Sequence, residues 1–296
     1  MKHAFLIMAH ADYPLLGRLL RKLDNPDNSI YIHIDAKSSF SENDANTLKN
    51  CCNFSQVKFI KRINYTWGGY SQIECMLRLL ETAVQDNNDY YHYLTGIDFP
   101  TKSMEYIHNF FETNKGKEFV HFCIDDFAER FAFRFTIYHL FDEKIGKTRK
   151  GIYNFAERVV HLLQRYILKI DRTKKYREIV FKGGSVYSSI THSFAKYLLD
   201  KEPSVKKMFG KSYCCDEFFL QTIIYNSPYK ENLYSCEVDG IQRYWNMRSI
   251  DWDRGTPYVF DIDDYKNLVT SDNLFCRKVS DKTEKQEMLV QRLEEL

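Results

Sequence analysis

Two adjacent carboxylates, at positions 216 and 217, have a setting suited to acid–base chemistry. Residues 213–225 read Y-C-C-D-E-F-F-L-Q-T-I-I-Y, in which apolar residues recur at helical spacing directly after the two acids. The first turn of a helix stabilises a carboxylate through its free N–H groups and its dipole. We interpret Asp216 as the cap of this helix. Glu217 is then a candidate general base, able to take a proton from a hydroxyl group.

Metal ligation and nucleophilic catalysis find less support in the sequence. The eight cysteines contain no C-x-x-C pair, the spacing typical of zinc sites, and we expect free thiols. His10, His33 and His92 occur in strand-like runs and are interpreted as core or rim residues rather than ligands. Ser185 and Ser188 have no matching His/Asp arrangement, so no catalytic triad is predicted.

An alternation of strand and helix patterns predicts the framework that positions these residues. Residues 4–9 form a continuous apolar run, which is typical of a strand buried on both faces. The predicted strands are 4–9, 30–35, 57–60, 90–94 and 118–122, and the predicted helices are 15–23, 72–84 and 104–111. This β-α-β rhythm favours an α/β fold with a mostly parallel central sheet and helices on both faces. The common G-x-G-x-x-G and P-loop motifs are absent.

Length and composition are compatible with one large domain. The 296 residues are 44% hydrophobic, which is enough for one large core or two smaller ones. The formal net charge of +2 argues against a nucleic-acid partner. No run approaches the ~20 apolar residues of a membrane-spanning helix, and no signal-peptide cleavage site follows the first apolar run. We therefore expect a cytoplasmic protein.

Residues 144–182 form a distinct basic segment. They contain 12 Lys or Arg residues against three acids, Glu157, Asp171 and Glu178. Between residues 152 and 167, apolar residues recur at helical spacing. A basic amphipathic helix of this kind can lie on an anionic membrane surface, but an ordinary surface helix has the same pattern. The sequence leaves both interpretations open.

Five groups of motifs, in order along the chain, carry a resemblance to a known family. They are A-F-L-I-M-A-H (4–10) with I-H-I-D-A-K (32–37), Y-T-W-G-G-Y (65–70), Y-L-T-G-I-D-F-P (93–100), G-G-S-V-Y (183–187) with C-D-E-F-F (215–219), and I-D-W-D-R-G-T-P (250–257) followed by L-F-C-R-K-V (274–279). Together they resemble the core-2/I-branching β-1,6-N-acetylglucosaminyltransferases, a family that also contains the peptide xylosyltransferases. The chain looks like a bacterial-type member.

The resemblance implies a GT-A type nucleotide-sugar fold with inverting chemistry. Glu217 falls on the family's catalytic base, Asp35 falls where the family binds the nucleoside, and Trp67 lies near the donor. Arg277 and Lys278 fall on the cationic patch that holds the diphosphate of the donor.

The remaining expected contacts lie within the same motifs. Arg254 and Arg248 are both in the region of a second diphosphate-binding cation, and we prefer Arg254. Asp98, Ser185 and Trp252 are expected to contact substrate.

The resemblance also implies that no divalent cation takes part. GT-A enzymes that use Mn²⁺ or Mg²⁺ usually place a D-x-D after a mid-chain strand, because hard cations bind carboxylate and phosphate oxygens together. Here that position reads G-I-D and offers Asp98 alone. The two D-x-D triplets, 251–253 and 261–263, come late and are interpreted as loop and capping residues. Arg and Lys can compensate the charge of a leaving UDP directly, so we expect neither a metal nor a cofactor.

We expect residues 1–281 to form one catalytic domain. Residues 1–122 would be its nucleotide-binding half, 123–281 its acceptor and catalytic half, and 282–296 a C-terminal helical tail. The expected reaction moves GlcNAc or xylose from a UDP-sugar to a glycan or lipid-linked glycan, at the cytoplasmic face of a bacterial membrane. An inactive glycan-binding relative and a protein-modifying transferase are the alternatives.

Overall fold

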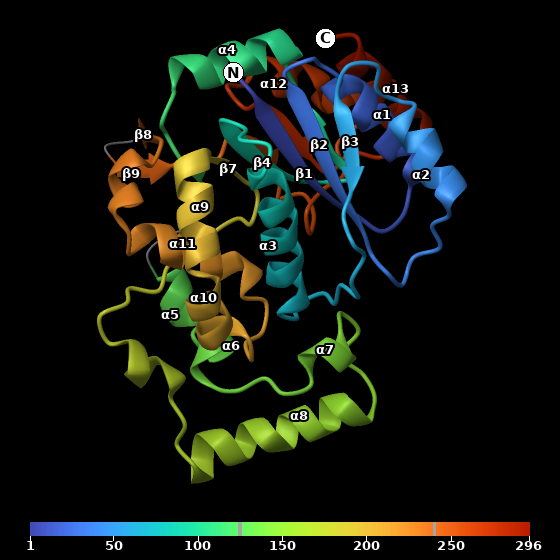
Figure 1. Cartoon of the computed structure of the whole chain (residues 1–296). Coiled ribbons are helices and arrows are strands. Elements are labelled where there is room, and N and C mark those ends of the chain that lie inside the picture. The colour runs from blue at the N-terminus through green and yellow to red at the C-terminus, as the bar shows by residue number, and fades with distance from the viewer. Residues whose placement is uncertain (124–125, 239–240) are drawn as a thin grey trace.

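A six-stranded sheet forms the centre of the molecule (Figure 1). The structure is a computed structural model that describes residues 1–123, 126–238 and 241–296. The strand order is β3-β2-β1-β4-β7-β6. These strands are β1 (His3–Ala9), β2 (Asn28–Ile34), β3 (Gln56–Phe59), β4 (Tyr90–Thr95), β6 (Phe119–Val120) and β7 (Ser188–Thr191). β7 runs antiparallel to β4 and β6, whereas β1, β2, β3 and β4 are parallel, so the sheet is mostly parallel as predicted.

Helices cover both faces of this sheet. The helices of the described residues are α1 (Tyr13–Leu23), α2 (Glu42–Lys49), α3 (Ser71–Val84), α4 (Met104–Thr113), α5 (Phe127–Arg130), α6 (Phe133–Thr136), α7 (Asp142–Ile145), α8 (Ile152–Leu162), α9 (His192–Asp200), α10 (Glu202–Phe209), α11 (Asp216–Tyr225), α12 (Tyr265–Thr270) and α13 (Glu284–Glu294). This is the α/β architecture, with a mostly parallel sheet and helices on both faces, that the sequence predicts.

β1 shows why helices are needed on both faces. Its seven residues are all buried, and successive side chains point to opposite sides of the sheet. Leu6 lies in a core with Leu80 of α3 and Phe194 of α9. Ile7 lies in a second core with Leu20 of α1 and Leu293 of α13. The continuous apolar run at residues 4–9 is therefore explained by two cores that share one strand.

A second, three-stranded sheet joins the C-terminal part of the chain to the main body. It consists of β10 (Arg248–Ile250), β11 (Phe275–Arg277) and β5 (Asp98–Pro100), and β11 is antiparallel to β5. The register places Arg277 opposite Asp98. A separate hairpin is formed by β8 (Ser235–Val238) and β9 (Ile241–Tyr244).

The predicted elements are present, with two corrections. The strand expected over 118–122 is reduced to β6, because the chain beyond it bonds instead to the glycine pair at 183–184, with the Cys123 N–H donating to the Gly183 carbonyl. The second concerns Asp216, which is the first residue of α11 and not its cap. The cap position is Cys215, and no side chain there accepts a hydrogen bond from the helix.

The basic segment forms a projection below the main body (Figure 1). It begins with α7, continues through α8 into a π-helical turn at Leu163–Ile167, and returns through a 3₁₀ helix at Arg172–Tyr176. Within the described parts of the chain, no helix combines the length and apolar character needed to cross a membrane.

Candidate functional site

Glu217 opens α11 in an ion pair with Arg134, a residue for which the sequence offered no motif. The Arg134 Nη1 atom lies 2.5 Å from Glu217 Oε2. The guanidinium packs over the ring of Phe131, with 4.4 Å between its carbon and the ring centroid. The Glu217 side chain keeps 38% of its surface exposed, against 15% for Arg134. The carboxylate is therefore oriented by a fixed cation and still reachable from solvent.

The neighbouring acid, Asp216, belongs to a buried polar network. Gln72 donates to the Tyr65 hydroxyl at 2.7 Å and to Asp216 at 3.4 Å. Burial raises the pKa of Asp216 to about 7, and the Glu217 carboxylate contributes to this rise. Asp216 thus links α11 to the Y-T-W-G-G-Y motif.

Trp67 lies on the loop that this motif forms, against the chain segment leading to α11. Its ring packs edge-on to Tyr213, with 6.0 Å between centroids, and is 44% exposed. The Cys214 N–H donates to the Gly68 carbonyl at 2.8 Å. Gly68 has a φ of +80°, and a Cβ there would come within 2.7 Å of the Tyr213 ring. The glycine lets the Trp67 loop dock beside the base-bearing helix.

Asp35 directly follows β2, the position predicted for it. Its Oδ1 atom accepts from the N–H groups of Lys37 at 3.1 Å and Tyr65 at 3.2 Å. The Lys37 amine lies 3.5 Å from Oδ2. The loops after β2 and β3 are held together by this carboxylate at one edge of the sheet, where ligands bind in parallel α/β folds.

Asp98 and Arg277 meet across the second sheet. Arg277 Nη1 lies 2.8 Å from Asp98 Oδ1, and the Thr95 N–H donates to Oδ2 at 2.6 Å. The guanidinium also covers the ring of Tyr187 at 4.4 Å. Asp98 is 3% exposed, so in this structure its carboxylate holds Arg277 rather than facing solvent.

Lys278 contributes a cation that has no carboxylate partner among the described residues. Burial lowers the pKa of Lys278 below its ordinary value, and the nearby Arg277 and Lys147 lower it further. An anion bound here would relieve this repulsion. Lys147, from the loop after α7, was not found from sequence because no motif surrounds it.

Arg254 lies beside this region, whereas Arg248 is inside the fold. Arg254 pairs with Asp251 at 2.6 Å and Asp264 at 2.8 Å, and its side chain is 48% exposed. The chain just after Arg254 is joined to Lys278 by backbone hydrogen bonds: the Lys278 N–H donates to the Tyr258 carbonyl, and the Phe260 N–H donates to the Lys278 carbonyl. Arg248 is buried, donates to Ser189 Oγ at 2.9 Å, and has its pKa lowered to about 9 by burial. Of the two, only Arg254 is accessible to an anion.

The late D-x-D triplets have the loop and capping roles predicted for them. Asp251 accepts from the N–H groups of Asp253 and Arg254. Asp261 caps the 3₁₀ helix at Ile262–Asp264, and Asp263 pairs with Lys285 at 2.5 Å.

Ser185 is close to the candidate base, but Trp252 is not brought to it by any described contact. The Gly184 N–H donates to the Glu217 carbonyl at 2.8 Å, and Gln221 donates to the Ser185 carbonyl at 2.8 Å. Trp252 is 62% exposed on the loop that carries Arg254.

The predicted roles of histidine and cysteine hold for most of these residues. His33 and His92 are buried and hydrogen-bonded, to the Ile63 N–H and to Ser189. His10 is exposed. All eight cysteines are free thiols, as expected.

Comparison with known proteins gives the same family as the motifs. The family model described as "Core-2/I-Branching enzyme" matches residues 3–268. Xylosyltransferase 2 of Rattus norvegicus is 24% identical over 308 residues, covering 97% of this chain and 32% of that protein. An N-acetyllactosaminide beta-1,6-N-acetylglucosaminyl-transferase of Homo sapiens is 24% identical over 294 residues, covering 93% of this chain and 67% of the other.

Among solved structures, mouse xyloside xylosyltransferase 1 in its apo form aligns with a TM-score of 0.45 at 11% identity, covering 95% of this chain and 99% of that chain. The chain spans about a third of the length of the xylosyltransferase 2 relatives it matches. Since the family model covers most of the chain, the protein belongs to the Core-2/I-branching enzyme family.

Proposed function

We propose that the protein is an inverting glycosyltransferase in which Glu217 is the catalytic base. The observation that supports this proposal most is a partly exposed carboxylate at a helix start, oriented by Arg134 and adjacent to the hydrogen bonds that join Asp216 to Gln72. Glu217 would take the proton of the acceptor hydroxyl while the oxygen of that hydroxyl forms a bond to the anomeric carbon of the sugar. The bond from that carbon to the phosphate oxygen breaks, and UDP leaves with the electron pair.

The charge that develops on UDP would be met by side chains. Lys278 lacks a carboxylate partner among the described residues, and Arg277 and Lys147 lie close to it. Asp98, the one carboxylate at the position of a D-x-D, is engaged by Arg277 at 2.8 Å. We therefore propose a metal-independent reaction in which fixed cations stabilise the leaving group.

Asp35 and Trp67 are the proposed nucleoside and donor contacts. Both lie at the loop edge that follows β2 and β3, and Trp67 presents an exposed ring. Ser185 and Trp252 are proposed for the acceptor side. The names of the relatives favour GlcNAc or xylose as the donor sugar, and one of them favours a glycan acceptor, which we propose is free or lipid-linked. A protein acceptor is the second candidate, because the family that the motifs resemble also contains peptide xylosyltransferases.

A donor screen tests this proposal. Purified protein is incubated with UDP-GlcNAc, UDP-xylose and other UDP-sugars, with and without glycan acceptors, and released UDP is measured. We expect release from one donor, increased by an acceptor and lost in Glu217→Gln. A protein that binds UDP but neither hydrolyses nor transfers any donor would be an inactive relative.

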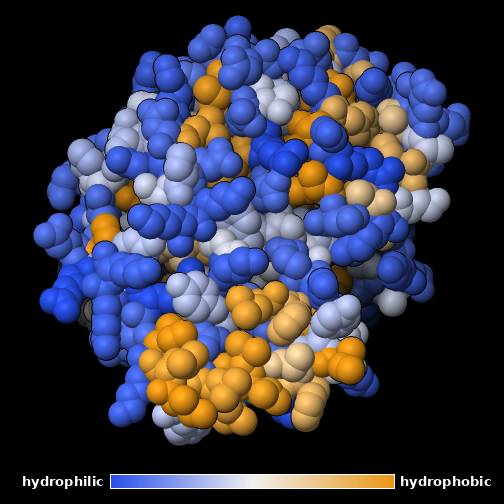
Figure 2. All heavy atoms as spheres, turned by 60° about the horizontal axis from the view of Figure 1, so that its bottom comes forward, coloured by the Kyte–Doolittle hydropathy of each residue, from blue (hydrophilic) through white to orange (hydrophobic). Residues whose placement is uncertain are grey.

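We further propose that α8 and the π-helical turn after it rest on an anionic membrane. The residues this segment turns toward the protein are polar, notably Glu157 and Gln164, and Gln164 exchanges hydrogen bonds with the Tyr138 backbone. The residues it turns outward are apolar: Ile152, Tyr153, Phe155, Val159, Leu162, Leu163, Tyr166, Ile167 and Leu168. Figure 2 shows this patch at the end of the molecule. An ordinary surface helix has the opposite orientation.

The charge of the segment around the patch supports an anionic surface as its partner. The segment 144–182 carries 12 Lys or Arg residues, and one of its three acids, Glu157, is buried. Anionic lipid head groups complement such a basic rim. We expect cosedimentation with phosphatidylglycerol vesicles and little with phosphatidylcholine vesicles, and loss of binding in Phe155→Glu. Equal recovery with both, or a dimer that forms through α8 in place of lipid binding, would overturn this part of the proposal.

A further inference from the structure

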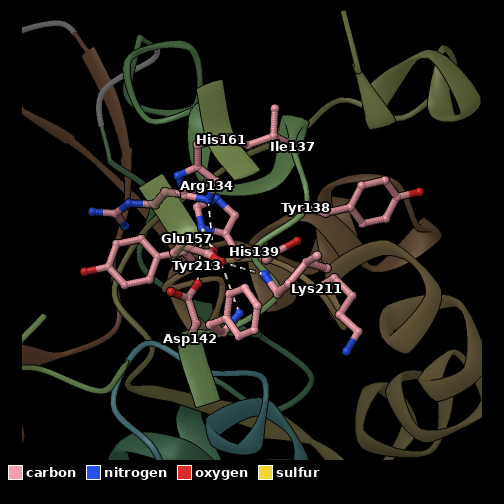
Figure 3. Close-up of polar contacts among 12 residues, drawn as sticks. Arg134, Ile137, Tyr138, His139, Asp142, Glu157, His161, Lys211 and Tyr213 are labelled. Atoms are coloured by element: carbon pink, nitrogen blue, oxygen red, sulfur yellow. Dashed lines mark hydrogen bonds and ion pairs between the residues drawn. The ribbon is translucent and has the colours of Figure 1, made fainter. Parts of the chain in front are cut away.

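Two histidines and two acids, from α8 and from the turn that leads into α7, lie together in a largely buried cluster (Figure 3). Glu157 and His161 are one helical turn apart on α8, so their side chains share a face. His139 precedes α7, and Asp142 is its first residue. His139, Asp142 and Glu157 are all at least 95% buried, and His161 is partly buried.

Three distances between donor atoms are close to the separation of ligands around a tetrahedral ion. His139 Nδ1 lies 3.2 Å from Asp142 Oδ2 and 3.5 Å from Glu157 Oε1, and His161 Nε2 lies 2.9 Å from the same glutamate oxygen. One donor atom from each of His139, Glu157 and His161 lies within 4.8 Å of the others. Zinc binds imidazole nitrogen and carboxylate oxygen at about 2.0–2.2 Å, which separates tetrahedral donors by about 3.3 Å.

Two of the atoms in this cluster lack a hydrogen-bond partner within the described parts of the chain, and a bound cation would satisfy both. His139 Nε2 donates to the Phe133 carbonyl at 2.9 Å, so Nδ1 of a neutral ring presents a lone pair. Neither His139 Nδ1 nor Asp142 Oδ2 has a hydrogen-bond partner among the described residues. A lone pair that faces two carboxylate oxygens in a buried position requires a positive charge between them.

The surrounding contacts resemble those that orient metal ligands. Glu157 Oε2 accepts from the N–H groups of Leu140 and Phe141 at 3.2 Å each, which directs Oε1 toward the histidines. Arg149 lies 3.4 Å from the other oxygen of Asp142. A backbone carbonyl on the far nitrogen of a histidine and amide donors on a ligating carboxylate are usual around bound metals.

We infer that His139, Glu157 and His161 form a structural Zn²⁺ site, with the Asp142 carboxylate beside His139. Two imidazoles favour zinc over Mg²⁺ or Ca²⁺, which prefer oxygen ligands. The site does not depend on Glu217 being a base. The site also contacts the segment that carries Arg134. The His139 ring stacks on Tyr213 at 5.7 Å, and the Tyr213 N–H donates to the Arg134 carbonyl at 2.8 Å. The ion would fix α8 to the segment that carries Arg134 and supports Trp67.

Metal content and cobalt substitution of the whole protein test this inference. After incubation with Zn²⁺ and removal of the excess, we expect about one zinc per chain, a higher melting temperature, and loss of both by EDTA. Co²⁺ in the apoprotein should produce the visible absorption of a tetrahedral ion. His161→Ala and Glu157→Gln should abolish zinc retention, whereas Arg158→Ala, an exposed change on the same helix, should keep it.

Three results would overturn the site. One is wild-type protein that retains no zinc, which would leave a protonated His139 as the cation. Another is full retention in His161→Ala. The third is a thiolate-to-cobalt charge-transfer band, which would place the ion on cysteines. If the variants fail to fold, the wild-type stoichiometry and cobalt spectrum still decide.

Discussion

Arg277 and Asp98 lie opposite each other in the antiparallel pair of β11 and β5, and their side chains form an ion pair of 2.8 Å. The pairing joins a mid-chain carboxylate to a cation almost 180 residues later in the chain. It engages the acid of the G-I-D motif, and it places Arg277 next to Lys278, which has no carboxylate partner among the described residues.

Removing Asp98 should therefore destabilise the fold. Asp98→Ala leaves Arg277 as a largely buried charge without its carboxylate, and breaking a buried pair in this way costs about 3–5 kcal/mol. Urea unfolding of the variant and wild type measures the change in the free energy of unfolding. Lys285→Ala, which removes an exposed pair with Asp263, should change it by less than ~1 kcal/mol. A similar small effect of Asp98→Ala would contradict a structural role for the pair.

Glu217→Gln should lower turnover by roughly 10²–10⁴ because the amide cannot take a proton. The change preserves size and the start of α11, so we expect UDP affinity by calorimetry to stay near the wild-type value. Glu74→Gln, on the exposed part of α3, is the matched control and should leave the rate unchanged. A Glu217→Gln variant that keeps half the wild-type rate would remove Glu217 from the catalytic role.

Lys278→Ala should weaken UDP binding by ~1–3 kcal/mol, the range for a charged hydrogen bond. The rate of transfer should fall further, since the phosphate gains charge in the transition state. Calorimetry with UDP and steady-state rates on the same variant give both values, and Lys285→Ala serves as the exposed control. If both quantities are unchanged, Lys278 does not bind the diphosphate.

Divalent cations should not stimulate transfer. We expect the zinc-loaded enzyme to be equally active with and without added Mn²⁺ or Mg²⁺, because cationic side chains meet the phosphate charge. Prolonged EDTA treatment distinguishes a catalytic metal from the proposed structural zinc. If one equivalent of Zn²⁺ restores the activity, the lost ion was the structural one bound by His139 and its partners. Activity restored only by Mn²⁺ or Mg²⁺ would instead refute metal-independent catalysis.

Because of Glu118, the free energy of unfolding should decrease as the pH rises. Its carboxylate is buried, and burial raises its pKa to about 7 from 4.5, although Thr191 donates two hydrogen bonds to it. The folded state therefore holds the proton more tightly than the unfolded state. The stabilising contribution is complete below pH 4.5 and is lost as the pH rises to about 7.

Glu118→Gln mimics the protonated acid and removes this dependence. Relative to wild type, the variant should be more stable at pH 8 than at pH 5 by roughly 1–3 kcal/mol, measured by urea unfolding at both values. Glu112→Gln, an exposed change on α4, should show no such difference. An equal effect of Glu118→Gln at the two pH values would mean that Glu118 is ionised in the folded protein throughout.

The sequence by itself determined the order of the elements and the place of Glu217. Strand burial on two faces and helix amphipathicity are local patterns with periods of two and 3.6 residues, so they can be recognised without the fold. The start of α11 at the two acids and the loop and capping roles of the late D-x-D triplets follow from short-range hydrogen bonds of the same kind. The cap assigned to Asp216 was off by one residue, because Cys215 takes that position without a side-chain bond.

Only the tertiary structure decided which distant side chains meet. Arg134 reaches Glu217 across 83 residues, and nothing near either residue in sequence requires it. The cluster of His139, Glu157 and His161 depends on how α8 folds back over the turn before α7. The direction of α8 was open for a related reason: periodicity defines an apolar stripe on a helix, but the stripe alone does not say which side packs on the body. Here the polar side does, because Glu157 and Gln164 have buried hydrogen-bond partners there, whereas the apolar side chains are exposed.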